Sequence, residues 1–306
     1  RVGIPLTKIR LFGLGQPLAD GLKMICKEEY TPSHVDRRLY VLAPLLILTA
    51  ALAVFAVIPF GSRVDAAGRS IDLAIIPGLD VGLIYIFALS SIAVYGVILG
   101  GWASNSKYSF LGGLRSSAQL IAYELPLGLG LLGIVLASSS LDLGTVMQKQ
   151  AENGWWFAFT QPLGFLVFVI AAFAEAARLP FDLPECEQEL IGGYHTEYAG
   201  IKLLLFLVAE FIHMITASFL IVILFLGGWH FWGLTGSDPV AGNLGIALLR
   251  VLVLLGKVFL VIVFFMMVRW SWPRFRFDQL MGLAWKVMLP LGLLNFVTVS
   301  ILLEIK

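Results

Sequence analysis

The sequence predicts an all-α protein, a polytopic membrane helix bundle with seven spanning helices and an interfacial amphipathic helix. Hydrophobic residues make up 59% of the 306 residues and charged residues only 13%, whereas about a quarter of the residues of a soluble domain are charged. The apolar residues form long continuous runs and do not alternate with polar ones, which favours helices over strands. Because lipid offers the backbone no hydrogen bonds, each run of about 20 apolar residues is interpreted as a spanning helix.

The first predicted element is an interfacial amphipathic helix at residues 14–28. Its apolar and polar residues each recur at helical spacing but fall on different faces. The apolar set is Leu14, Leu18, Leu22 and Ile25, and the polar set is Gln16, Asp20, Lys23 and Lys27. Such a helix lies in the membrane surface. It is expected to serve either as a simple anchor or as the wall of a cavity that is open to lipid.

Seven spanning helices follow within a single membrane domain that covers residues 1–306. They are expected at about 39–60, 81–103, 116–141, 154–177, 203–229, 244–268 and 284–304. If the N-terminus lies in the cytoplasm, the inner segments hold fifteen Lys and Arg residues and the outer segments four. This bias agrees with the positive-inside rule.

The connection at residues 178–202 is unusually acidic for a loop between two membrane helices. It contains five carboxylates, Asp182, Glu185, Glu187, Glu189 and Glu197, and the predicted orientation places them on the cytoplasmic side. A loop that only connects two helices needs no such charge. We therefore expect a functional role for this acidic loop outside the lipid.

Several ionisable residues fall inside the apolar runs, and the candidates for a buried functional charge are Glu124, Glu175, Glu210 and Lys257. A charge at the centre of a spanning helix costs roughly 2.5–3.5 kcal/mol, so such residues usually face the bundle interior or a hydrated path. Glu175 is three residues from Arg178, and Glu210 is three residues from His213, so each pair is expected to share a helix face. The pattern fits structural ion pairs and interhelical hydrogen bonds, or a hydrated chain of carboxylates along which protons or charge move.

Several chemistries are not supported by the sequence. Gly128–Gly133 matches GxGxxG, but it lies inside an apolar run with no preceding strand, so close helix packing is the preferred interpretation. The Glu210–His213 ExxH pair occurs once, whereas a di-iron bundle needs two such pairs, and no metal site is expected. The two cysteines, Cys26 and Cys186, form no CxxC pattern. By itself the chain is expected to hold no redox centre and to bind no nucleic acid.

Four segments together resemble the H subunit of bacterial NADH:quinone oxidoreductase, the respiratory complex I, whose mitochondrial counterpart is subunit 1. They are QPLADGLK at 16–23, AEAARLPFDLPECEQELIGGYHTEY at 174–198, AE at 209–210 and PRFRFDQLM at 273–281. The resemblance covers essentially the whole chain in order. The family has eight spanning helices, so a first helix of some tens of residues is expected to precede Arg1.

The resemblance implies a membrane-arm subunit that forms much of the quinone chamber and couples quinone reduction to proton translocation. The substrate would be ubiquinone or menaquinone, with no cofactor held covalently, and the flavin and iron–sulfur clusters would belong to partner subunits. The expected partners are the peripheral-arm subunits that carry the terminal cluster and the quinone site, small membrane-arm subunits, antiporter-like subunits and lipid. The expected location is the bacterial inner membrane, with the mitochondrial inner membrane as the alternative.

The resemblance also assigns two groups of site residues. The quinone chamber and its mouth would include Arg1, Gln16, Asp20, Lys23, Arg178, Phe181, Arg274 and Arg276. The proton or charge relay would include Glu124, Glu175, Asp182, Glu185, Glu187, Glu189, Glu197 and Glu210. A quinone has an apolar tail and could enter from lipid beside the helix at 14–28. Its reduction would change the field at the carboxylates and move the acidic loop, in which Gly192 and Gly193 permit a backbone change.

Three other interpretations remain open on the sequence alone. The chain could be the ion-coupling membrane subunit of an energy-converting hydrogenase or formate hydrogenlyase, which works without quinone. It could also be a free-standing proton or sodium transporter, or a purely structural anchor. The acidic loop favours obligate docking to soluble subunits over an independent transporter.

Overall fold

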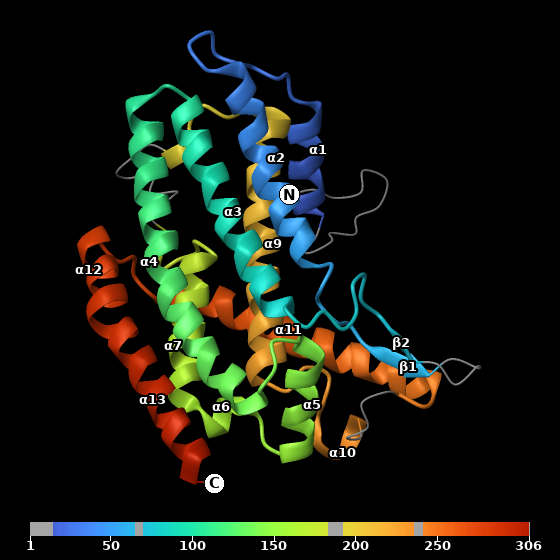
Figure 1. The fold of residues 1–306 in the computed structure, drawn as a ribbon. Coiled ribbons are helices and arrows are strands. Elements are labelled where there is room, and N and C mark those ends of the chain that lie inside the picture. The colour runs from blue at the N-terminus through green and yellow to red at the C-terminus, as the bar shows by residue number, and fades with distance from the viewer. Residues whose placement is uncertain (1–14, 65–69, 183–191, 236–240, 306) are drawn as a thin grey trace.

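Helices form almost all of the regular structure, as Figure 1 shows. The computed structural model describes residues 15–64, 70–182, 192–235 and 241–305. Within these ranges the fold is an all-α bundle with one small antiparallel hairpin, which confirms the predicted fold class. The hairpin joins β1 (Ser62–Val64) to β2 (Ser70–Asp72), with Arg63 opposite Ile71.

Six helical segments of the described chain are long and apolar enough to cross a membrane. They are α2 (Arg37–Val54), α3 (Gly82–Ala103), α4 (Lys107–Ser138), α9 (Gly200–Phe225), α11 (Leu244–Ser271) and the continuous segment of α12 (Phe277–Gly282), η2 (Leu283–Met288) and α13 (Leu289–Ile305). The remaining helices are shorter. They are α1 (Gln16–Cys26), α5 (Leu143–Asn153), α6 (Phe157–Thr160), α7 (Pro162–Glu175), η1 (Gly193–His195) and α10 (Trp232–Thr235).

The segment expected at 154–177 is divided into two helices, α6 and α7. Gln161 leaves the helical conformation, with φ of −132° and ψ of 63°, because the residue before a proline is disfavoured in the α region. Pro162 then occupies the first turn of α7, where its missing N–H is tolerated. The 14 residues of α7 span about 21 Å, less than the roughly 30 Å hydrocarbon core of a bilayer.

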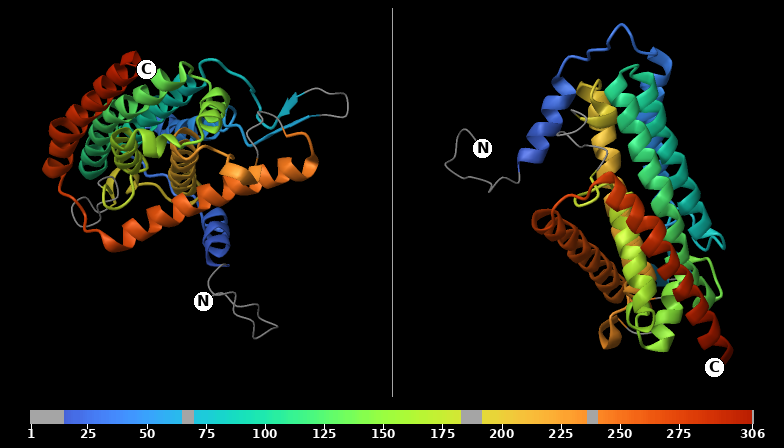
Figure 2. Two further views of the ribbon diagram at one scale, coloured as in Figure 1. Left: turned by 90° about the horizontal axis from the view of Figure 1, so that it is seen from below. Right: turned by 90° about the vertical axis from the view of Figure 1, so that its left-hand side faces the viewer.

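The centre of the bundle is formed by α4 and α9. The 32-residue α4 packs against α3, α7 and α13, and α9 packs against α2, α7 and α11. The last ten residues of α9, Thr216–Phe225, are all buried. The two views in Figures 1 and 2 show α11 crossing the bundle obliquely, at a steep angle to α4 and α9. The carboxylates of α4 and α9 are therefore carried by the two most enclosed helices.

Lys257 of α11 caps the C-terminal end of α9. Its ammonium group donates hydrogen bonds to the carbonyl oxygens of Leu226 at 2.6 Å, Gly228 at 3.0 Å and His230 at 2.7 Å. It also lies 4.5 Å from the centre of the Trp156 ring. Carbonyls at a helix C-terminus lack partners within the helix and carry a partial negative charge. A buried cation at this position is therefore a structural cap, and this explains the lysine within an apolar run.

We expect Lys257→Met to destabilise the outer end of α9. The substitution keeps a long side chain but leaves three carbonyls without their charged donor, so the free energy of unfolding should fall by about 3 kcal/mol. The measurement is the unfolding temperature of this subunit in the purified assembly. Lys149→Met is the matched control, because Lys149 is exposed on α5, and it should leave the unfolding temperature unchanged. Equal unfolding temperatures for the two variants would contradict the cap.

Candidate functional site

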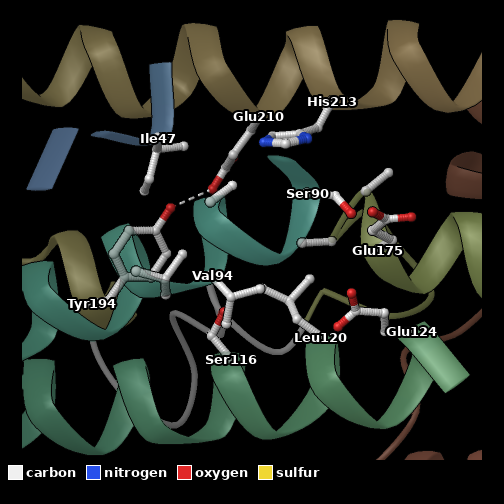
Figure 3. A pocket seen from close by; sticks show the side chains of 14 residues that line it. Ile47, Ser90, Val94, Ser116, Leu120, Glu124, Glu175, Tyr194, Glu210 and His213 are labelled. Carbon is white, nitrogen blue, oxygen red and sulfur yellow. Dashed lines mark hydrogen bonds between the residues drawn. The ribbon is translucent and has the colours of Figure 1, made fainter. Parts of the chain in front are cut away.

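Three predicted relay carboxylates meet in one cavity inside the bundle. Glu124 comes from α4, Glu175 from the end of α7 and Glu210 from α9, and all three line the same space together with Tyr194 and His213. Figure 3 shows these side chains directed into it. We call this space the carboxylate cavity. It contains about 640 Å³ of empty volume, its open mouth included, and its remaining walls are mainly small and apolar side chains of α2, α3 and α4.

Glu210 is held by donors from two separate parts of the α7–α9 connection. The Tyr194 hydroxyl donates a hydrogen bond of 2.7 Å to its Oε1. The Arg178 guanidinium lies 3.7 Å from its Oε2 and 4.3 Å from the centre of the Phe211 ring. Both ion-pair side chains are nearly buried, at 8% exposure for Arg178 and 13% for Glu210. A carboxylate in this position links the loop to the bundle interior.

The pairing of Arg178 differs from the predicted one. The sequence spacing favoured a shared helix face for Arg178 and Glu175. In the structure α7 ends at Glu175, and Ala177 adopts a left-handed conformation with φ of 49°. The chain therefore turns before Arg178, which forms its ion pair with Glu210 of a different helix. The other expected pair is confirmed, since Glu210 and His213 face the same cavity.

Two serines of α3 accompany the other two carboxylates. The Ser91 hydroxyl donates to Glu124 Oε1, and Ser90 lies beside Glu175, which is also close enough to Glu124 for their charges to interact. Sequence reasoning missed Ser90, Ser91 and Tyr194. The two serines could have been noticed, because they place adjacent hydroxyl groups in the middle of the apolar run at 81–103.

Predicted residues on the two loops meet in a second group near the cavity. Arg274 Nη2 lies 3.0 Å from Asp182 Oδ2, so Asp182 pairs with a residue assigned to the quinone chamber and does not line the carboxylate cavity. The Phe181 ring stacks on Phe275 with 5.5 Å between centres. Gln119 of α4 donates to the carbonyl of Phe181 at 2.8 Å. The start of the acidic loop is therefore fixed to both α4 and the segment before α12.

The remaining predicted residues lie elsewhere. The helix α1 carries Gln16, Asp20 and Lys23, and it packs against α9 but has no buried residue. On this helix Gln16 Nε2 donates a hydrogen bond of 3.2 Å to Asp20 Oδ1. Arg276 is exposed just before α12. Glu197 is outside the cavity, and its backbone carbonyl accepts a 2.7 Å hydrogen bond from the Tyr40 hydroxyl. Four predicted residues, Arg1, Glu185, Glu187 and Glu189, lie outside the described residues.

The end of the acidic loop is held by aromatic packing. The rings of Tyr40 and Tyr198 stack with 4.1 Å between centres, and Lys202 Nζ lies 5.2 Å from the Tyr40 ring. Burial, and secondarily the nearby Tyr40, raise the pKa of the Tyr198 phenol. Tyr198 therefore stays neutral at ordinary pH, and its hydroxyl has no hydrogen-bond partner among the described residues.

This arrangement is suited to moving protons over short distances. Carboxyl, hydroxyl and imidazole groups can each accept and donate a proton, and those in this cavity can also form hydrogen bonds to water. In the described part of the chain no three His, Cys, Asp or Glu side chains are grouped so that they could hold a metal ion.

Comparison with known proteins gives one consistent result. The family profile described as NADH dehydrogenase matches residues 1–300. The chain is 48% identical over 299 residues to NADH-quinone oxidoreductase subunit 8 of Thermus thermophilus, a match that covers 98% of this chain and 77% of that protein. It is 46% identical over 291 residues to the NADH-quinone oxidoreductase H subunit of Protochlamydia amoebophila, covering 95% of this chain and 84% of that protein. NADH-quinone oxidoreductase subunit 8 of Rhodothermus marinus is 44% identical over 301 residues, with coverage of 94% and 84%.

We expect Gly112→Ala to displace the loop segment that carries Tyr194. A Cβ atom on Gly112 would lie 2.7 Å from the carbonyl carbon of Gly193 and 2.8 Å from the Tyr194 nitrogen, so η1 has to move away from α4. Amide hydrogen exchange at residues 192–199 should become faster. Gly128→Ala on the same helix is the control, because a Cβ atom there meets nothing within 4 Å. The idea is wrong if both variants exchange at the rate of the parent.

A second prediction compares two tyrosines of the same loop. Tyr194→Phe removes the hydroxyl that donates to Glu210, and the loss of a hydrogen bond to a charged group costs about 1.5–3 kcal/mol. Local opening of residues 192–199 should therefore be at least about tenfold more frequent. Tyr198→Phe removes a buried hydroxyl with no partner among the described residues and should not increase opening. Hydrogen exchange measured by mass spectrometry tests both variants, and an equal effect of the two would refute the role of the Tyr194 hydroxyl.

Proposed function

Because this chain belongs to the family of the NADH-quinone oxidoreductase H subunit, we propose that it forms a wall of the quinone chamber and couples quinone reduction to proton translocation. The family places it in an enzyme complex as a multi-pass membrane subunit. The observation that carries the proposal is the convergence of Glu124, Glu175 and Glu210 from three helices on one cavity. Keeping three carboxylates inside a membrane bundle is costly, and a purely structural subunit would not need them.

The chamber is assigned to the region around Arg178, Phe181 and Arg274. These residues lie on two segments that are joined by the Asp182–Arg274 ion pair and by the Phe181–Phe275 stack. The guanidinium groups suit a polar quinone head, and the aromatic side chains suit its ring. Gln16, Asp20 and Lys23 on the exposed helix α1 would form the mouth through which the apolar tail enters from lipid.

The coupling step would pass through Arg178. Its guanidinium is 3.7 Å from Glu210, and two unit charges about 4 Å apart interact by roughly 4 kcal/mol at an effective dielectric constant of 20. A change of charge on the quinone that attracts or releases Arg178 therefore changes the stability of the Glu210 carboxylate. Glu210 would then exchange protons with Glu175 and Glu124 across the carboxylate cavity. Asp182, Glu185, Glu187, Glu189 and Glu197 would extend this relay along the acidic loop.

Quinone would be the substrate, and partner subunits would supply the flavin and the iron–sulfur clusters. The peripheral-arm subunits would dock near the acidic loop, and small and antiporter-like membrane subunits would receive the protons. A bacterial inner membrane is the proposed location. The three relatives are all named as NADH-quinone oxidoreductase subunits, so the comparisons do not support a hydrogenase or formate hydrogenlyase subunit.

The test uses Glu210→Gln and Glu175→Gln in the intact complex reconstituted into liposomes. Each variant keeps the shape of the side chain but cannot carry the proton, so quinone-linked proton pumping should fall by about tenfold or more. Electron transfer from NADH to an artificial acceptor of the peripheral arm should continue at the parent rate. Glu152→Gln, on the exposed surface of α5, is the control and should pump normally.

Two results would sink the proposal. If pumping per electron is unaltered in both variants, the relay assignment fails. If both variants lower the amount of assembled complex, but the complex that does assemble pumps protons at the parent level, the carboxylates are structural.

A further inference from the structure

A second cavity continues from the carboxylate cavity along α9. It contains about 330 Å³ of empty volume, and its walls include Thr216, Ala217 and Leu220, which lie one to two turns further along α9 than His213. We call it the deep cavity. The two cavities have three wall residues in common, Ser90, Glu175 and His213. These residues form the boundary between the space near the acidic loop and the space deeper in the bundle.

His213 has a special position at this boundary. It lies three residues after Glu210 and three before Thr216, so it is a neighbour of each of them on the surface of α9. In Figure 3 the imidazole lies between Glu210 on one side and the Ser90 and Glu175 pair on the other. The ionisable side chains that line both cavities are Glu175 and His213. Because His213 lines the carboxylate cavity together with Glu210 and Glu175, its imidazole lies on a route that a proton can take between the two carboxyl groups.

The chemistry of imidazole suits this passage. A neutral histidine has one ring nitrogen that accepts a proton and another that donates one. A proton from the Glu210 carboxyl can bind the accepting nitrogen, and the other nitrogen then releases its proton to the Glu175 carboxylate. The ring returns to its neutral form in the other tautomer, and no electron or other bond is involved.

The surroundings of His213 are acidic or neutral. Glu210 comes from its own helix, Glu175 from α7 and Glu124 from α4, while α3 contributes Ser90 and η1 contributes Tyr194. The basic group paired with Glu210 in the described structure is Arg178, which is not among the described residues that line either cavity. A transient imidazolium would therefore face the carboxyl groups of Glu210, Glu175 and Glu124, which line the same cavity.

We propose that His213 is the proton-transfer residue between Glu210 and the Glu175–Glu124 pair, at the boundary of the two cavities. The inference rests on the proposed function of the carboxylate cavity and adds a residue that lies outside the four family segments. The alternative is that the imidazole only fills space in the wall. The two roles can be told apart by substitution. A side chain of similar size that carries no proton should preserve pumping if His213 only fills space, but should not preserve it if His213 transfers protons.

The experiment uses the intact complex in liposomes with His213→Leu and His213→Gln, and with Ser218→Ala as the control. Among the described residues, the Ser218 hydroxyl donates to the carbonyl of Met214 in its own helix, at 2.9 Å. Both His213 variants should lower quinone-linked proton pumping by about tenfold, while NADH oxidation by an artificial acceptor and pumping by the control stay at the parent level. Normal pumping in His213→Leu and His213→Gln would overturn the proposal.

A rescue measurement separates proton transfer from structural damage. His213→Ala leaves space beside the carboxylate cavity, and added imidazole should restore pumping with a pH dependence that follows the titration of free imidazole. A small apolar ring such as cyclopentane should not restore it. Restoration by both molecules, or by neither, would overturn the role of His213 in proton transfer.

The outcomes also separate this inference from the proposed function. If Glu210→Gln and Glu175→Gln lose pumping but the His213 variants do not, the carboxylate relay stands and His213 is not part of it. If the glutamine variants pump normally, the relay itself fails and the inference fails with it.

Discussion

The structure depends on one constraint: each carboxylate inside the bundle has to meet a donor or a polar partner from another element. Glu210 accepts a hydrogen bond from the Tyr194 hydroxyl and forms an ion pair with Arg178. Glu124 accepts a hydrogen bond from the Ser91 hydroxyl, and Glu175 lies beside Ser90. An ionisable group without such partners is costly in lipid. These contacts tie α3, α4, α7 and α9 to the acidic loop, so the groups that would carry protons also determine how the helices pack.

The same reasoning explains the cations at the opposite end of the bundle. Lys257 satisfies three carbonyls after the C-terminus of α9, and Arg250 donates to the carbonyl of Thr235 from Nε at 3.2 Å and from Nη2 at 3.0 Å. Both bases are on the oblique helix α11 and are almost fully buried. The helix that carries Glu210 and His213 is thus held at one end by the acidic loop and at the other by a lysine cap. A rigid α9 keeps the spacing of the two groups fixed.

Membership in the family of the NADH-quinone oxidoreductase H subunit explains why a lipid-embedded chain combines an acidic loop with intramembrane carboxylates. The ion pair between Arg178 and Glu210 connects the two, since Arg178 lies at the start of the loop and Glu210 lines the cavity. A change in the position of Arg178 in the loop would therefore change the electrostatic environment of Glu210 in the cavity. The deep cavity continues this space along α9, where Thr216, Ala217 and Leu220 form its wall.

The sequence alone determined the all-α bundle, the presence of a helix near residues 14–28, the family and the identity of the carboxylates within the apolar helices. These features depend on composition, on local periodicity and on continuous motifs. Only the tertiary structure decided the pairings: Arg178 with Glu210 instead of Glu175, Asp182 with Arg274, and Ser91 with Glu124. The break before Pro162 has a local cause in the proline itself, whereas the left-handed turn at Ala177 was not predicted from the sequence. The physical reason is that a helix pattern shows which face a side chain occupies, whereas its partner on another helix depends on the depth and tilt at which the two helices cross.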